Sequence, residues 1–223
     1  MSTPASLGFV FCAGWALPRD FLAPLQAALA EHFPAAPMRT IDLNYFKAAP
    51  LLATAPAQHW IGIGHSWGFV QLLRSAQPWR GLVSINGFTH FCATPQAPGV
   101  AREMFQQLQD GMVHDPAATV RRFYRLCGLP STLRPAEDLP FAALQRELTE
   151  LGQCDEVCPN TLLALAAEND AVVPAALTRY CFDGHPQHWH PDAGHALGWH
   201  APQWCAEKIA AWVNSLPPQE HAT

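Results

Sequence analysis

Apolar residues fall into short, almost uninterrupted runs along the chain, with segments of helical spacing between them. Runs of this kind, without a polar residue at every second position, are typical of parallel strands buried on both faces. They predict six strands, at residues 7–12, 38–43, 58–63, 81–86, 161–167 and 188–190.

Between these runs the apolar positions follow a helical period. Phe21, Leu22, Leu25 and Leu29 recur at helical spacing, and Asp20 is placed to cap the start of that helix. Further helices are expected at residues 66–76 and 202–216. Strands that alternate with helices predict the α/β class, with a mostly parallel sheet covered by helices on both faces.

The alternation stops between Phe88 and Pro159, where the pattern predicts only helices, separated by Gly and Pro turns. The expected helices cover roughly residues 100–110, 116–127 and 139–151. We therefore predict a core formed by residues 1–88 and 159–223, and an all-helical lid inserted at residues 89–158. An insertion between two strands is expected to lie over the carboxyl ends of the sheet.

The third predicted strand runs into Gly64-x-Ser66-x-Gly68, and a helical pattern follows. A serine at a sharp turn from strand to helix is the signature of a nucleophile elbow, and small residues on either side let strand and helix approach. Ser66 is therefore the predicted nucleophile. The alternative is a glycine-rich turn with a structural role only.

A serine hydroxyl needs a general base, and the base needs an acid to orient it. In folds with this elbow the partners follow in the order Ser, acid, His. Asp170 follows the fifth predicted strand, and His195 follows the sixth. Because ligands bind at the carboxyl ends of parallel strands, we predict Asp170 as the acid and His195 as the base.

Both assignments have rivals nearby. Glu168 or Asp192 could orient the histidine instead. The spacing His188-x-His190-x-Asp192 suggests a metal site, but a metal site would leave the elbow unexplained. We expect neither metal nor cofactor. Histidines also crowd this region, at His185, His188, His190 and His200.

The tetrahedral intermediate of ester hydrolysis needs two N–H donors aimed at its oxyanion. The backbone N–H of Trp67, directly after the nucleophile, is one expected donor. The other is expected from Ala13-Gly14-Trp15 after the first strand, with Trp15 as the donor. For both tryptophans the alternative is a role in core packing.

Composition narrows the setting. The 223 residues carry a formal net charge of −5, which argues against nucleic acid as the partner. No apolar run approaches the ~20 residues that span a bilayer. Seven cysteines without a CxxC pair, and an amino-terminal stretch without a basic region, predict a cytoplasmic protein without a secretion signal.

These motifs resemble the α/β-hydrolase fold and, within it, the BioH-type pimeloyl-[acyl-carrier protein] methyl ester esterases. The elbow, the loop that begins at Asp170 and the Ala-Gly-His195 turn carry the wider resemblance. The narrower one rests on three segments of the predicted lid, Phe91-Cys-Ala-Thr, Phe105-Gln-Gln-Leu and Thr119-Val-Arg-Arg-Phe123. Members usually have His-Gly-Trp after the first strand, whereas this chain has Ala13-Gly14-Trp15.

The resemblance implies a serine esterase that releases methanol from a carrier-bound dicarboxylate in biotin synthesis. The acyl carrier protein is acidic and would bind lid arginines, while Phe123 and Trp15 would contact the substrate. Residues 116–135 contain no acidic residue, and their arginines are Arg121, Arg122, Arg125 and Arg134. An ordinary solvated helix face is the alternative. A short-chain esterase or thioesterase without a carrier partner, or a ligand receptor of this fold, would also fit the sequence.

Overall fold

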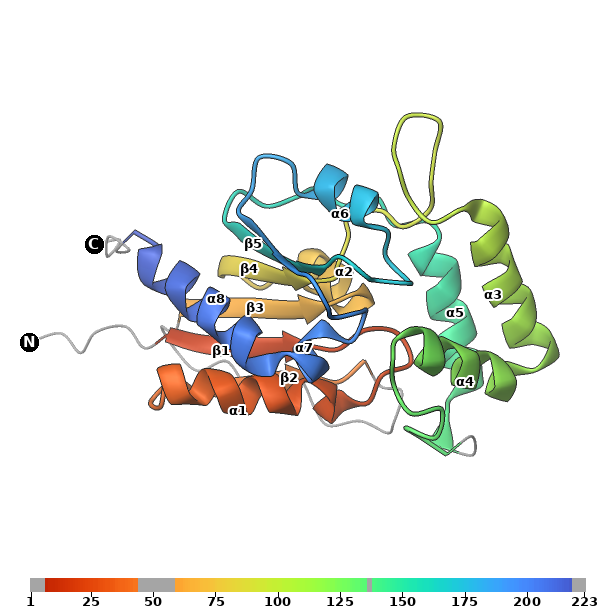
Figure 1. Ribbon diagram of the computed structural model, residues 1–223, viewed down its shortest axis with the longest axis horizontal. Coiled ribbons are helices and arrows are strands. Elements are labelled where there is room, and N and C mark those ends of the chain that lie inside the picture. Colours follow the sequence, from red (N-terminus) through yellow and green to blue (C-terminus); the bar gives the residue numbers. More distant parts are fainter. Residues whose placement is uncertain (1–6, 44–58, 136–137, 218–223) are drawn as a thin grey trace, which may run out of the picture.

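The computed structural model describes residues 7–43, 59–135 and 138–217. Within them six strands form one parallel sheet in the order β2-β1-β3-β4-β5-β6 (Figure 1). The strands are β1 (Leu7–Cys12), β2 (Met38–Ile41), β3 (His59–His65), β4 (Trp79–Ile85), β5 (Leu162–Ala167) and β6 (Gln187–His190). All six predicted strands are confirmed, although Gln58, the expected start of the third, lies outside the described residues.

The register brings the carboxyl ends of the central strands into line. Cys12 pairs with Gly64, Gly64 pairs with Ser84, and Ser84 pairs with Ala164. The segments that follow β1, β3, β4 and β5 therefore leave the sheet at the same edge. Three of these four segments contain the residues predicted to do chemistry.

The predicted helix after β1 is confirmed, but its expected cap at Asp20 is wrong. A 3-10 turn, η1 (Arg19–Leu22), comes first, and α1 (Ala23–His32) begins after Leu22 without a side-chain cap. Proline in the first turn explains this start, because its fixed φ suits a helix and its missing N–H needs no partner. Asp20 instead lies 3.6 Å from Arg134.

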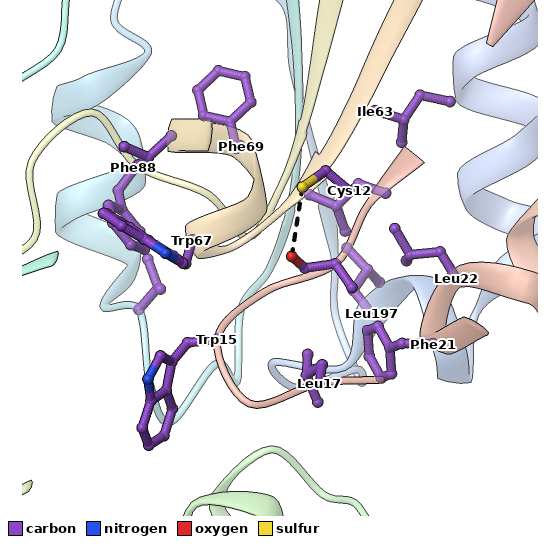
Figure 2. Close-up of a cluster of buried hydrophobic side chains, with 14 of the residues drawn as sticks. Cys12, Trp15, Leu17, Phe21, Leu22, Ile63, Trp67, Phe69, Phe88 and Leu197 are labelled. Carbon is purple, nitrogen blue, oxygen red and sulfur yellow. Dashed lines mark hydrogen bonds between the residues drawn. The ribbon is translucent and has the colours of Figure 1, made fainter. Parts of the chain in front are cut away.

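Helices cover both faces of the sheet. The elbow helix α2 (Trp67–Arg74) lies on one face, while α1 and α8 (Pro202–Ser215) pack against each other on the opposite face (Figure 1). Figure 2 shows Trp67, Phe69 and Phe88 gathered on one side of β1 and β3, and Phe21 and Leu22 on the other. Apolar residues of both layers therefore meet the central strands.

Two short helices were not predicted, α6 (Ala175–Cys181) and α7 (Leu197–His200). With seven and four residues, they are too short to show a helical period in the sequence. They matter because α6 follows the loop of Asp170, and α7 begins two residues after His195.

The insertion between β4 and β5 contains the three predicted helices, α3 (Arg102–His114), α4 (Pro116–Leu126) and α5 (Phe141–Leu151). They stand beyond the edge of the sheet to which the strand arrows point (Figure 1). The expectation of helices only is wrong in detail, since isolated β-bridges join His90 to Asp155 and Cys92 to Val100. The first of these bridges holds the two ends of the insertion together.

The seven cysteines are all free thiols, and six of them are buried. Burial raises the pKa of the half-buried Cys158 thiol to about 11, so it stays protonated at neutral pH. Among the described residues, no helix is both long and apolar enough to cross a membrane.

Candidate active site

Ser66 occupies a strained turn between β3 and α2. Its φ is 52° and its ψ is −124°, in a region that residues other than glycine rarely adopt. The backbone N–H of Ser66 donates to the carbonyl of Ile85 at 3.0 Å, and its carbonyl accepts from the N–H of Phe69 at 3.0 Å. This is the conformation that the elbow motif predicts.

The two glycines of the motif are required by close backbone contacts. A Cβ at Gly64 would overlap the backbone of Phe69, which is the strand-to-helix approach expected from the sequence. A Cβ at Gly68 would overlap the carbonyl oxygens of Cys12 and Ala13. The second glycine therefore admits the end of β1, a neighbour that the motif alone did not reveal.

Asp170 and His195 form a buried pair. His195 Nδ1 donates to Asp170 Oδ2 at 2.8 Å, and the two side chains are 0% and 2% exposed. Asp170 Oδ1 accepts the backbone N–H groups of Val172 at 2.7 Å and Val173 at 2.9 Å. Because the carboxylate acts only as an acceptor here, Nδ1 carries the proton of this bond, and in the neutral imidazole Nε2 is the nitrogen with the lone pair.

Glu168 and three of the nearby histidines have other partners. Both carboxylate oxygens of Glu168 contact Arg179, at 3.3 and 3.2 Å. His190 Nδ1 accepts from the backbone N–H of Asp192 at 3.2 Å. His185 contacts Cys158, and His200 contacts the carbonyl of Gly128. In the described part of the chain, no group of three or more His, Cys, Asp or Glu could hold a metal ion.

The expected hydrogen bond from Ser66 to His195 is not formed in this structure. His195 Nε2 is buried and has no partner among the described residues. The His195 ring nevertheless packs against that of His65, the neighbour of Ser66, with 4.8 Å between ring centroids. Nucleophile–base bonds are often long without substrate. The complete triad stays a prediction.

The segment after β1 lies directly against the elbow. A Cβ at Gly14 would stand 3.0 Å from the Cβ of Ser66, and Ala16 has a φ of 57°. Neither the backbone N–H of Trp15 nor that of Trp67 has an acceptor within residues 7–43, 59–135 and 138–217. Two uncommitted donors beside the serine are what an oxyanion hole needs, and this role too stays a prediction.

The side chains around this segment bind the helical insertion. The indole of Trp15 donates to the carbonyl of Leu144 at 2.9 Å, and the indole of Trp67 donates to Glu147 at 3.0 Å. The hydroxyl of Tyr124 donates to the carbonyl of Ala16 at 2.7 Å. The buried tryptophan side chains therefore do have the structural role that was the alternative, while the backbone N–H groups of both residues have no acceptor among the described residues.

A cavity of about 200 Å³ opens beside Ser66, between the sheet edge and the insertion. It is lined by Phe123, Trp15 and Arg122, three of the residues proposed from the sequence to contact the substrate or its carrier. Arg121 instead lines a second cavity of about 310 Å³, and Arg125 lies exposed on α4. The remaining walls of the first cavity are mainly apolar, from Phe91, Val100, Met104, Phe105, Leu108, Leu126, Leu148, Leu151 and Val172.

Sequence reasoning missed Asn86, His65 and Tyr124. All three are buried and polar, and their hydrogen bonds reach residues about 110 to 130 positions away. The available signal was a polar residue at the end of an apolar run, at His65 and Asn86, although a single sequence does not show its partner.

The sequence matches no protein-family profile and no curated protein. Solved structures do resemble this one. An esterase from Exiguobacterium antarcticum has a TM-score of 0.76 at 14% identity, with 96% of this chain and 94% of that chain covered. A hydrolase from Oleispira antarctica has a TM-score of 0.76 at 10% identity, with coverages of 96% and 92%. BioG from Haemophilus influenzae has a TM-score of 0.62 at 18% identity, with coverages of 91% and 94%.

This chain has the α/β-hydrolase fold. The fold predicted from the elbow and the order of elements is therefore confirmed. At these identities the likeness concerns the arrangement of the chain, so the α/β-hydrolase fold identifies neither a substrate nor a reaction.

Proposed function

We propose that this protein is a serine carboxylesterase with Ser66 as nucleophile, His195 as general base and Asp170 as the acid that orients it. The observation that carries this proposal is the buried 2.8 Å bond between His195 and Asp170, beside a serine held at φ 52°. An apolar cavity that opens onto that serine offers room for an acyl chain.

The proposed reaction has two halves. Ser66 Oγ attacks the ester carbonyl carbon while His195 Nε2 takes its proton, and the N–H groups of Trp15 and Trp67 bind the oxyanion. His195 then returns the proton to the departing alkoxide, which leaves as an alcohol. A water molecule, deprotonated by His195, attacks the acyl-enzyme and releases the carboxylic acid.

We further propose that helices α3–α5 form the lid of this site and that the substrate is a pimeloyl-[acyl-carrier protein] methyl ester. Arg122 lines the cavity, and α4 also exposes Arg121 and Arg125. These arginines form a basic surface on a chain of net charge −5, which suits an acidic carrier. The lid motifs that resemble BioH-type esterases support the same substrate.

The test has two parts: the first asks whether Ser66 reacts as a nucleophile, and the second asks which ester is the preferred substrate. A fluorophosphonate should label wild-type protein and leave the Ser66→Ala variant unlabelled; absence of labelling would favour a ligand receptor. The values of kcat/KM for methyl pimeloyl-carrier protein and for free methyl esters of graded length should then differ in favour of the carrier-bound ester. Equal values would indicate a short-chain esterase or thioesterase without a carrier partner.

A further inference from the structure

We propose that His65 and Asn86 are positioning residues for His195, and that they act on one atom, its backbone carbonyl oxygen. The inference rests on the proposed role of His195 as the base. His65 Nε2 lies 2.8 Å from this oxygen, and Asn86 Nδ2 lies 2.9 Å from it. A carbonyl oxygen has two lone pairs, so both groups can donate to it at once.

His65 links the base to the nucleophile, because Ser66 is the next residue in the chain. A carbonyl can only accept, so Nε2 must carry a proton, and in the neutral ring Nδ1 then carries none. Nδ1 is buried without a partner among the described residues, beside Gly14. Burial lowers the pKa of His65 to about 3, so the ring stays neutral in the tautomer that this bond requires.

Asn86 links the base to the acid. Its Nδ2 also donates to the carbonyl of Gly194 at 3.1 Å, and its Oδ1 accepts the N–H of Ala167 at 2.9 Å. Ala167 ends β5, three residues before Asp170. Asn86 has a φ of 46°, a conformation that asparagine tolerates better than most residues, so backbone and side chain both suit the position.

These bonds matter because the backbone of His195 forms no other hydrogen bond with the described residues. The preceding strand, β6, has only four residues. Within the described residues, the side chain of His195 hydrogen-bonds only to Asp170. Loss of either donor would leave the carbonyl with one partner and let the imidazole shift. Displacements of about 1 Å in a catalytic group can cost about 100-fold in rate.

The test compares two substitutions at His65. Glutamine can place its amide nitrogen where Nε2 lies and keep the donor, whereas phenylalanine keeps a ring of similar size without one. We expect His65→Phe to lower kcat about 10- to 100-fold with KM within about twofold, and His65→Gln to restore most of the loss. Asn86→Gly, which accommodates the positive φ but removes both donors, should resemble His65→Phe.

A second readout does not depend on turnover. The NMR signal of the His195 Nδ1 proton, bonded to Asp170, should shift or broaden in His65→Phe and Asn86→Gly and persist in His65→Gln. Wild-type kcat and an unchanged signal in both the phenylalanine and glycine variants would overturn the inference. So would an equal loss in the glutamine and phenylalanine variants while circular dichroism stays native. An inactive wild-type protein would refute the esterase proposal, but the NMR comparison would still decide this one.

Discussion

The cavity beside Ser66 has two unlike walls. On the sheet side the polar groups are buried and held by short hydrogen bonds, as in the three bonds accepted by Asp170. On the insertion side the wall is mainly apolar, and it exposes Met104 (62%) and Leu126 (49%) beside the arginines of α4. The sheet side can fix the geometry of a reaction, whereas the insertion side can select what reaches it.

The two walls meet through the hydrogen bonds of Trp15, Trp67 and Tyr124. This contrast predicts that sheet-side substitutions lower kcat for every ester, and that substitutions of the exposed arginines of α4 change only the choice of substrate. Substitutions at the contact between the walls should show both effects.

The largest expected effect is at the nucleophile. Ser66→Ala removes the attacking oxygen and should lower kcat for any ester by about 10⁶-fold, as in comparable triads. Ser75→Ala, at the opposite end of α2, is the matched control and should retain full activity. Steady-state hydrolysis of a small ester measures both. If the Ser66→Ala variant kept its turnover, Ser66 would not be the nucleophile, and the sheet side of the cavity would not carry the reaction.

Asp170→Asn should lower kcat by about 10⁴-fold with little change in KM, because an amide no longer holds the imidazole in the required tautomer. Glu168→Gln tests the rival acid and should have almost no effect, since Glu168 contacts Arg179 at the surface. The two variants are compared with the same ester. A larger loss at Glu168 than at Asp170 would reverse the assignment of the acid.

Tyr124→Phe tests the contact between the walls. It leaves the carbonyl of Ala16 without its donor, which costs about 1–3 kcal/mol. We expect lower stability and a kcat reduced about 10-fold, as the segment with Trp15 loosens. Tyr180→Phe, at an exposed tyrosine, is the control. Thermal melts and kinetics on one small ester measure both; an unchanged kcat would show that the insertion does not support the oxyanion site.

His65 makes the sheet side sensitive to acid. Its pKa is about 3 in the folded protein, against an ordinary value of 6.5. Between these values the unfolded chain binds more protons, so the free energy of unfolding falls as the pH falls from 6.5 towards 3, by at most about 1.4 kcal/mol per pH unit. When the free energy of unfolding from denaturant titrations is plotted against pH, it should fall less steeply for His65→Gln than for the wild type. Equal slopes would show that His65 is not the buried titrating group.

The most selective effect is expected at the exposed arginines of α4. Reversing the charge of Arg122 and Arg125 together to glutamate should lower kcat/KM about 10-fold for a carrier-bound ester and leave a small ester unchanged. Arg146→Glu, a single charge reversal at an exposed arginine on α5, is the control for a change of surface charge away from α4. On the carrier-bound ester, the difference in kcat/KM between the variant and the wild type should be large at low salt and small at high salt, because salt screens the interaction between charges. Equal losses on both substrates would contradict a carrier-docking surface.

The sequence predicted the proposed catalytic residues of the sheet side better than the residues that hold them in place. Elbow and strand ends are local patterns, so Ser66, Asp170 and His195 could be placed in order. Asp20 was misjudged because a 3-10 turn and a proline-initiated helix compete with a capped one. Asn86 and Tyr124 escaped because their partners are set by tertiary packing, and no local pattern encodes a contact about 108 residues distant.

The bond from Tyr124 to Ala16 bears on engineering. A foreign insertion grafted onto this sheet to change specificity would need a phenol at the position of Tyr124 and a helix carbonyl at that of Leu144. Without them, the chimera would gain a new pocket, but the segment with Trp15 and Ala16 would lose its two hydrogen bonds to the insertion. An insertion engineered for a new substrate should therefore keep the hydrogen bonds from Tyr124 to Ala16 and from Trp15 to the carbonyl at the position of Leu144.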